Sequence, residues 1–369
     1  MIKRIYIDNF RCFSNFEIEP GRINLLFGLN GSGKSSFVDA IDRLVALVID
    51  GREVGELFVE NDLTRWDTRH EQRFEIDDVV DGQTFTYGAT LKRISDGAGM
   101  VLHEERVSCG DRVLFRYEHG EVHLHRNDGK EGTCFPFRGN RSFIAGIEER
   151  PETTSLMSFL EHLGAFRSYK LAPVGMESVT HEEQQRLLKD GSNFASWYRH
   201  MSQERAGDVP HLFEQLVEVL PGFKSIALKG AGKQGRTRDL VVQMETGERS
   251  YEVAFDSLSD GQRALIVLYA LLIDIRANSQ TVLMDEPENY VGLSELQPWL
   301  QNLDEALGDA GQLFLISHHP EVIDFLAAEN PILFERSAGG PVRVRNADFD
   351  REGGLKASEQ ISRGLLDGE

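Results

Sequence analysis

The chain has 369 residues, and its 40 lysines and arginines against 60 aspartates and glutamates give a formal net charge of −20. Hydrophobic residues make up 40% and charged residues 27%, which is typical of a globular chain and excludes a disordered or collagen-like one. The three cysteines form no CxxC pair, which excludes a zinc finger and a disulfide scaffold and indicates a reducing compartment.

The sequence predicts a cytoplasmic protein without membrane contact. No run approaches the ~18 to 20 apolar residues needed to span a bilayer. The N-terminus alternates like a strand and lacks the apolar region of a signal peptide. The acidic balance opposes broad attraction to nucleic acid, although it leaves room for a local basic face.

Hydrophobic spacing predicts strands and helices in alternating regions. Residues 2–8 and 22–27 predict two strands joined by a turn around residues 20–21, and a helix follows from about residue 37. Residues 70–147 predict an antiparallel meander with Gly-containing turns at 81–82, 96–97, 109–110 and 128–129. After Pro151 the pattern is helical to about residue 220, and residues 224–255 predict a smaller hairpin region.

The last third of the chain returns to alternating helix and strand. The pattern predicts helices at 259–277 and 294–307 and buried strands at 281–286 and 312–317. The fold class expected is α/β, with a mixed core sheet of P-loop type interrupted by an antiparallel β region and a helical insert. We expect a single domain over 1–369, with segments at 1–50 (P-loop), 51–150 (antiparallel β), 151–223 (helical lobe), 224–335 (later motifs) and 336–369 (C-terminal extension).

A phosphate-binding loop lies between an apolar strand and a helix. Residues Gly28–Ser35 (GLNGSGKS) match G-x-x-x-x-G-K-[ST] at every fixed position. Glycines permit turns that aim backbone N–H groups at a phosphate, and the helix N-terminus adds positive potential. Lys34 is expected to reach the β- and γ-phosphates of ATP, and the Ser35 hydroxyl to ligate Mg²⁺. The nucleotide-binding residues expected here are Asn30, Gly31, Ser32, Gly33, Lys34, Ser35 and Ser36.

Two later apolar strands end in polar residues. The first ends in two carboxylates, of which Asp285 is expected to hold Mg²⁺ and Glu286 to accept a proton from the attacking water. The second is followed by two histidines. His318 is expected to hydrogen-bond the γ-phosphate or to orient the water, whereas His319 is interpreted as an ordinary loop histidine. The expected catalytic residues are therefore Glu286, His318 and Lys34.

A further motif, Ser257–Arg263 (SLSDGQR), opens the long apolar helix 22 residues before Asp285. In this order with the P-loop, the acidic strand end and His318, it resembles the ABC-type ATPases. Within them the chain is similar to the RecF/SMC/OLD-related group, whose opening is similar to Ile5–Phe13. The specific motifs cover about 60 residues of the chain.

The resemblance implies ATP and Mg²⁺ as cofactors and hydrolysis of ATP to ADP and phosphate. It places the family's signature motif at 258–262, where Ser259, Gly261 and Gln262 would contact ATP bound to an opposite protomer. Two head-to-tail protomers would then sandwich two ATP molecules, and hydrolysis would loosen this homodimer. Arg11 is expected to approach the nucleotide, and the Q-loop glutamine of the family is not located, with Gln184 and Gln185 as candidates by position.

The resemblance also guides the biological interpretation. Asp260, where transporters have glycine, favours the RecF-like branch, and the helical insert has no long coiled coil as in an SMC clamp. The residues after His318 are too few for the nuclease domain of OLD-type proteins. We therefore expect the sensor ATPase of a prokaryotic antiviral system, with a separate nuclease or toxin as effector and with oligomers above the dimer left open. The alternative is a RecF-like DNA-repair ATPase that binds DNA; a membrane-transporter subunit is disfavoured.

Three weaker features stay open. The basic, Gly-rich loop at 229–238 is interpreted as a hairpin tip, with nucleic-acid or partner contact as the alternative. His119, His123 and His125 are interpreted as exposed strand histidines rather than as metal ligands. The amphipathic segment at 358–367 is expected to pack on its own domain rather than on a neighbour.

Overall fold

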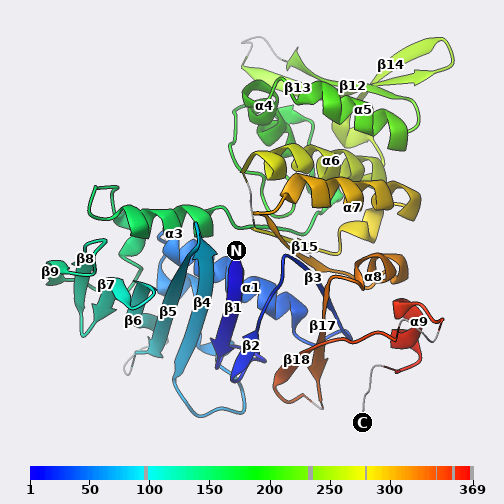
Figure 1. Ribbon diagram of the computed structural model, residues 1–369. Helices are drawn as coiled ribbons and strands as arrows, with labels where there is room; N and C mark the ends of the chain where they lie inside the picture. The colour runs from blue at the N-terminus through cyan, green and yellow to red at the C-terminus, as the bar shows by residue number, and fades with distance from the viewer. Residues whose placement is uncertain (95–98, 232–235, 279–280, 338, 351–353, 366–369) are drawn as a thin grey trace. The chain divides into compact units, whose positions relative to one another are not determined.

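The computed structural model describes residues 1–94, 99–231, 236–278, 281–337, 339–350 and 354–365. Its internal contacts divide the chain into two compact units. Unit 1 comprises Met1–Phe166 and Ile323–Glu369, and unit 2 comprises Arg167–Val322. Figure 1 labels the helices and strands of both units.

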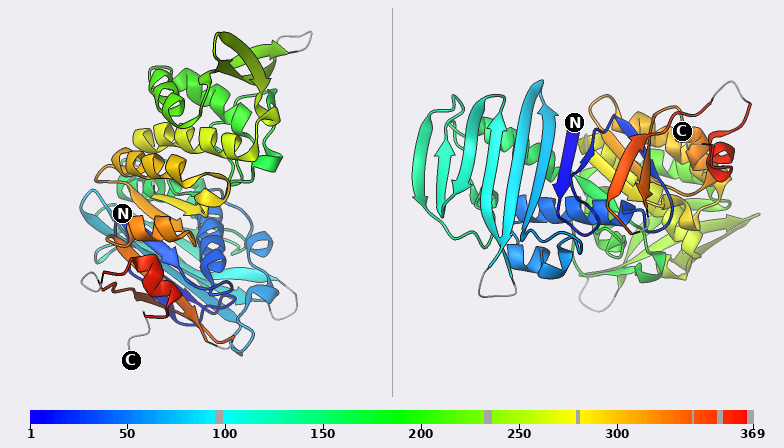
Figure 2. Two further views of the ribbon diagram at one scale, coloured as in Figure 1. Left: turned by 90° about the vertical axis from the view of Figure 1, so that its right-hand side faces the viewer. Right: turned by 90° about the horizontal axis from the view of Figure 1, so that it is seen from below.

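The described part of unit 1 contains an antiparallel sheet of eight strands in the order β2-β1-β4-β5-β6-β7-β8-β9. Consecutive strands from β4 to β9 pair as hairpins, which confirms the predicted meander (Figure 2). Positive φ angles at Asp81, Gly82, Gly110 and Gly129 form three of the predicted turns, whereas the turn predicted at 96–97 lies outside the described residues. The strands are β1 (Ile2–Asp8), β2 (Phe16–Ile18), β4 (Glu71–Val80), β5 (Gln83–Arg93), β6 (Met100–Cys109), β7 (Arg112–Glu118), β8 (Glu121–His125) and β9 (Glu131–Pro136).

Alternation along these strands gives the sheet an apolar face and a polar face. Helix α3 (Thr154–Gly164) packs on the apolar face, where the ring of Phe159 stacks on Phe85 and Tyr87 at centroid distances of 5.7 and 6.4 Å. Figure 1 shows α3 crossing the strands of the meander. The opposite face carries the charged side chains of β1, β4, β5 and β6.

The other strands of unit 1 are β3 (Ile23–Phe27), β17 (Asn330–Arg336) and β18 (Val342–Asn346). β17 runs parallel to β3 and antiparallel to β18. The two N-terminal strands predicted from the sequence are therefore not a hairpin, because β1 pairs with β2 and β4 instead. The physical reason lies in burial: all five residues of β3 are buried, as in a parallel sheet covered on both faces, whereas β1 alternates.

The helices of unit 1 include α1, which is the first helix after β3 and buries eight of its residues, among them Phe37, Ile41 and Leu44. C-terminal helix α9 is held by Ser358, whose backbone N–H and hydroxyl both donate to Asp324, so this segment packs on its own unit. The bounds are α1 (Lys34–Val48), α2 (Val54–Leu57), η1 (Glu60–Asp62), η2 (Ile144–Gly146), α9 (Ala357–Ser362) and, across the boundary of the units, α8 (Pro320–Leu326).

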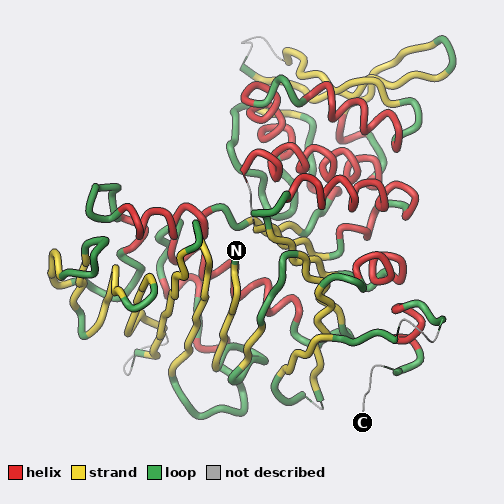
Figure 3. The backbone as a smooth tube through the Cα atoms, in the orientation of Figure 1, coloured by secondary structure: helices red, strands yellow, loops and turns green. Residues whose placement is uncertain are grey.

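Unit 2 contains three parallel strands in the order β10-β15-β16 and a second sheet in the order β11-β13-β12, with β14 on β13. Helix α6 is apolar on all sides and packs between α5 and α7, and α5 packs on β12, as the layers in Figure 3 show. The strands are β10 (Arg167–Tyr169), β11 (Val179–Thr180), β12 (Phe223–Ala231), β13 (Thr237–Thr246), β14 (Arg249–Ala254), β15 (Thr281–Asp285) and β16 (Gln312–Ile316). The helices are η3 (Pro173–Gly175), α4 (Phe194–Glu204), α5 (Val209–Val219), η4 (Phe255–Ser257), α6 (Asp260–Asn278), η5 (Pro287–Tyr290) and α7 (Leu293–Leu307).

The prediction of continuous helix from 151 to 220 is wrong for residues 165–193, which hold two short strands, a 3-10 turn and loops. Backbone groups there find partners across the loop: the N–H of Lys170 donates to Lys189 O, and that of Ala172 to Asp190 O. Asn193 fixes the same loop, because its Oδ1 accepts from Leu188 N. Among the described residues, no helix combines the length and the apolar character that crossing a membrane requires.

Candidate functional site

The predicted phosphate loop lies in unit 1 between the buried strand β3 and the N-terminus of α1. Gly28 has φ +141°, and a Cβ there would lie 2.3 Å from the carbonyl oxygen of Phe334. Gly33 has φ +106°, and a Cβ there would lie 2.7 Å from a methyl group of Val342. Both positions therefore require glycine, through conformation and through the close approach of β17 and β18.

Lys34 is buried at the start of α1, and its Nζ donates to Gly28 O at 2.7 Å and to Leu29 O at 3.1 Å. Its ammonium is thus held inside the loop. Ser32 is buried, with its Oγ 3.3 Å from the same ammonium. The loop tip faces solvent, and the residues exposed there are Leu29, Asn30, Gly31 and Ser35, while Ser36 is half-buried. A buried cation below an exposed turn at a helix N-terminus is the arrangement that an anionic phosphate chain needs.

Arg11 lies in a positive-φ turn of unit 1, at φ 50°. Its guanidinium pairs with Asp39 on α1 at 2.8 Å and with Asp62 at 3.0 Å. Arg43 pairs with both carboxylates as well. Burial raises the pKa of Asp62, but hydrogen bonds from the Val59 N–H and from the two guanidiniums outweigh burial and hold it below its usual value. The expected approach of Arg11 to a nucleotide stays a prediction.

In unit 2, Asp285 ends the buried strand β15, as predicted. Its Oδ2 accepts a hydrogen bond of 2.7 Å from the ammonium of Lys170, which follows the neighbouring parallel strand β10. This hydrogen bond raises the pKa of Lys170, against the lowering effect of desolvation. Lys170 was not among the residues singled out from the sequence, because only strand pairing brings it to Asp285.

Glu286 and His318 lie together at the ends of β15 and β16. Glu286 has a left-handed backbone, at φ 52°, at the point where β15 ends. Its Oε1 is 3.6 Å from His318 Nε2, and its Oε2 accepts from Asn289 Nδ2 at 2.9 Å. The structure therefore joins two of the residues predicted to be catalytic. His319 accepts from Glu321 N through Nδ1 at 3.3 Å, which fits the interpretation as a loop histidine.

Glu288 is a further acidic residue at these strand ends. Its Oε1 accepts from the Ser317 hydroxyl and, at 3.4 Å, from the backbone N–H of His318. Burial raises the pKa of Glu288, while the hydrogen bond from Ser317 acts in the opposite direction. Glu288 therefore holds the turn that carries His318. The sequence signal for it was its place two residues after Glu286, which did not distinguish it from a surface carboxylate.

The predicted signature residues form the N-terminus of α6. Ser259 and Gln262 cap it reciprocally: Ser259 N donates to Gln262 Oε1 at 3.0 Å, and Gln262 N donates to Ser259 Oγ at 3.3 Å. A Cβ at Gly261 would lie 2.6 Å from Tyr290 O, so glycine is required at this position. Gln184 is a candidate Q-loop residue. Its Nε2 donates to Glu182 Oε1 at 3.2 Å, and its Oε1 accepts from Asn193 Nδ2.

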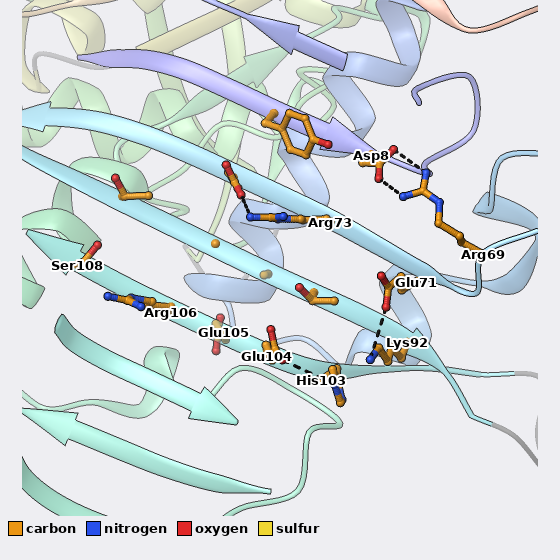
Figure 4. Close-up of a pocket in the computed structure, with 16 residues that line it drawn as sticks. Asp8, Arg69, Glu71, Arg73, Lys92, His103, Glu104, Glu105, Arg106 and Ser108 are labelled. Atoms are coloured by element: carbon orange, nitrogen blue, oxygen red, sulfur yellow. Dashed lines mark hydrogen bonds and ion pairs between the residues drawn. The ribbon is translucent and has the colours of Figure 1, made fainter. Parts of the chain in front are cut away.

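A hollow of about 770 Å³ lies on the polar face of the unit 1 sheet, separate from the residues predicted to bind nucleotide (Figure 4). Two of its cations are paired with carboxylates: Arg69 pairs with Asp8 at 2.6 Å, and Lys92 with Glu71 at 3.5 Å. In the basic loop at 229–238, Lys229 likewise pairs with Glu252, whereas Lys233 lies outside the described residues. Arg69, Lys92 and Lys229 are therefore each paired with a carboxylate, which reduces their attraction for a DNA phosphate.

The donor chemistry of the predicted metal ligands fits Mg²⁺. Ser35 offers a hydroxyl oxygen in unit 1, and Asp285 offers a carboxylate in unit 2. Hard oxygen ligands of this kind, completed by water and phosphate oxygens, are those that Mg²⁺ prefers.

Residues 1–87 match the family model described as an AAA ATPase domain. No curated protein matches the chain significantly. An SMC head bound to the C-terminal winged-helix domain of ScpA has a TM-score of 0.54 at 13% identity, covering 98% of this chain and 99% of that one. The SMC head domain of Thermotoga maritima has a TM-score of 0.49 at 16% identity, with coverage of 94% and 99%. The AAA match and the SMC head of TM-score 0.54 confirm the predicted fold class and the resemblance to ABC-type ATPases of the RecF/SMC group.

Proposed function

From the premise that the chain is an ATPase with this fold, we propose that it binds Mg·ATP at the Gly28–Ser36 loop and hydrolyses it with Glu286 as base. All 369 residues act as one ATPase domain in this proposal. The observation that carries it is the pairing of Glu286 with His318 and Asn289 at two strand ends. A second, separate observation supports it: in unit 1 the phosphate loop has the glycine conformations and the buried lysine that a nucleotide needs.

The proposed reaction is an in-line attack by water on the γ-phosphorus of ATP, in which the bond to the β–γ bridging oxygen breaks and ADP and phosphate form. Glu286 accepts the proton of this water. Asn289 donates to one carboxylate oxygen and so fixes the plane of the group, and His318 faces the other oxygen. Lys34 neutralises phosphate charge. Mg²⁺, held by Ser35 and Asp285, would supply further neutralisation of that charge.

The proposal includes a homodimer around ATP. Ser259 and Gln262 cap α6 at the positive end of its dipole, which suits the γ-phosphate of a second protomer; in this proposal the phosphate replaces the side-chain acceptors of the cap. Gly261 keeps this end close to Tyr290. Assembly beyond the dimer is left to measurement.

We further propose that ATP-driven dimerisation is a signal read by a separate effector protein, a nuclease or toxin, in antiviral defence. A solved SMC head of the same fold is bound to a domain of another protein, which supports a search for a protein partner. The alternative, a DNA-repair ATPase, requires DNA binding that weakens steeply with salt. The ion pairs of Arg69 and Lys92 with carboxylates favour the effector protein over DNA as the partner.

Two variants test the ATPase proposal. Lys34→Ala should lose ATP affinity by roughly 10- to 150-fold, since a hydrogen bond to a charged group contributes about 1.5–3 kcal/mol. Glu286→Gln should bind ATP normally and hydrolyse it about 100- to 10,000-fold more slowly. Lys3→Ala and Glu305→Gln, both exposed and in the same units, are the matched controls. Normal turnover in Glu286→Gln would remove it as the base.

The mass of the Glu286→Gln variant with and without Mg·ATP tests the dimer. Light scattering on a sizing column should show the 41.6 kDa monomer double when ATP is added. A monomer that binds ATP without dimerising would contradict the proposed signature role. Co-purification of a nuclease or toxin from the native host, dependent on ATP, would support the effector hypothesis, and salt-sensitive DNA binding alone would contradict it.

A further inference from the structure

The hairpin of β8 and β9 brings together a histidine, a cysteine and a carboxylate that the ATPase proposal does not use. It forms the edge of the unit 1 sheet (Figure 1). Its register places His123 directly opposite Cys134. Glu121 lies two residues before His123 on the same face of β8. From the sequence, His123 is interpreted, with His119 and His125, as an exposed strand histidine, since nothing in the sequence indicates that Cys134 lies opposite it.

The three ligand atoms are close enough to bind one ion. His123 Nε2 is 3.9 Å from Cys134 Sγ and 3.9 Å from Glu121 Oε2, and all three atoms lie within 4.8 Å of one another. In a tetrahedral zinc site, bonds of about 2.0 Å to nitrogen and 2.3 Å to sulfur separate those ligand atoms by roughly 3.5 Å. The two distances from His123 Nε2 exceed this value by about 0.4 Å, and rotation of the exposed Glu121 and Cys134 side chains would bring all three atoms into range.

The other ring nitrogen of His123 adds an independent observation. His123 Nδ1 is buried and has no hydrogen-bond partner within the described part of the chain, although Glu131 Oε1 lies 3.6 Å away. A histidine that binds a metal through Nε2 commonly donates its Nδ1–H to a carboxylate, which fixes the ring. Glu131 is placed for this contact by its position on β9.

The charges around the hairpin also suit a cation. Glu121 and Glu131 carry two negative charges, and Cys134 adds a third when it binds as thiolate. The opposing group is Arg116, which pairs with His123 across β7 and β8. Its guanidinium is drawn toward Glu118 at 3.1 Å, so that its charge is partly neutralised there.

We propose that the β8–β9 hairpin binds Zn²⁺ through Cys134 Sγ, His123 Nε2 and the Glu121 carboxylate, with water in the fourth position. A mixed sulfur, nitrogen and oxygen set selects a thiophilic transition metal over Mg²⁺ or Ca²⁺. The ion links the edge strand β9 to β8. This site is independent of ATP binding.

Zinc chloride alone is the probe for the first test, by isothermal titration of the full-length protein stripped of metal with a chelator. The wild type should bind one equivalent, and His123→Ala and Cys134→Ser should each lose it, whereas His119→Ala should retain it. His119 is the matched control because it lies in the preceding turn, outside the cluster. Equal zinc binding by the wild type and the His123→Ala/Cys134→Ser double variant would overturn the site.

Cobalt substitution identifies the ligands. The Co²⁺ form of the wild type should show a sulfur-to-cobalt charge-transfer band in the near ultraviolet, which Cys134→Ser should abolish. Its persistence in that variant would assign the metal to another cysteine and overturn the proposal.

Zinc should also raise the thermal midpoint of the wild type, since a ligand bound only by the folded state stabilises it. Metal-free midpoints that match among the variants would show that the loss of binding is not loss of folding.

Discussion

The ammonium of Lys170 lies 2.7 Å from the carboxylate of Asp285, at the ends of two neighbouring parallel strands. The carboxylate proposed to hold Mg²⁺ is therefore already paired with a cation of the same unit. Lys170 is half exposed whereas Asp285 is buried, so solvent screens only the lysine side of the pair, and a bound ion has to replace this hydrogen bond. This contact connects the proposed metal site with a segment that carries no nucleotide motif.

Lys170→Ala should strengthen the apparent affinity for Mg²⁺ in the presence of ATP. A fully exposed ion pair contributes about 0.2–1 kcal/mol, and a pair with a buried carboxylate contributes at least as much, so the dissociation constant should be lower by roughly 1.4- to 5-fold or more. Titration of Mg²⁺ into the ATP-bound protein measures this, with Lys224→Ala as the control, because Lys224 forms an exposed pair with Glu245 in the same unit. Weaker Mg²⁺ binding would mean that Lys170 supports Asp285 rather than competing for it.

The sequence predicts those parts of the candidate site that are formed by residues close together in the chain. The phosphate loop is contiguous, and the strand ends at Asp285 and His318 follow from apolar runs, so all three were predicted. Lys170 and Asp285 are 115 residues apart, and only the pairing of β10 with β15 joins them. Cys134 opposite His123 is likewise a matter of hairpin register.

The helical prediction for residues 165–193 failed for a related reason. Residues 181–190 have the spacing of an amphipathic helix. Their backbone groups nevertheless form hydrogen bonds with Asn193 and with the backbone of the Lys170 segment. Tertiary hydrogen bonds of this kind override a weak helix propensity. Periodicity cannot show them, since the partners lie outside the periodic segment.

Gly261→Ala should destabilise unit 2 and weaken the ATP-dependent dimer. The new Cβ would lie 2.6 Å from Tyr290 O, so the N-terminus of α6 must shift. Overpacking of this kind costs about 1–3 kcal/mol of unfolding free energy, measurable by urea denaturation. Gly207→Ala is the matched control, because a Cβ there has nothing within 4 Å among the described residues. Equal stability of the two variants would show that the Tyr290 carbonyl moves aside without a loss of unfolding free energy.

Stability should fall as pH rises toward neutrality because of Glu105. Burial raises the pKa of this carboxyl to about 7, although hydrogen bonds from Ser142 and Tyr87 act in the opposite direction. The folded state then keeps a proton that the unfolded chain loses near its ordinary pKa, so the stabilisation present at low pH disappears as pH rises through about 7. Between about pH 5.5 and 8 the unfolding free energy should drop by roughly 2 kcal/mol from this group. Glu105→Gln should remove that slope in urea denaturation, and an unchanged slope would assign it elsewhere.

Trp66 should report the base of a bound nucleotide. Its exposed ring faces the guanidinium of Arg336 at 5.6 Å, and Arg336 pairs with Val342, whose methyl group packs against Gly33 of the phosphate loop. The other two tryptophans are buried and cannot stack on a base, so the part of the fluorescence change on adding ATP that comes from stacking should vanish in Trp66→Phe. Since stacking of a base on an aromatic ring contributes about 1–3 kcal/mol, Trp66→Ala should weaken ATP binding by roughly 5- to 150-fold. Tripolyphosphate, which has no base, should bind the variant and the wild type equally, and an equal loss for both ligands would place the effect on the loop instead.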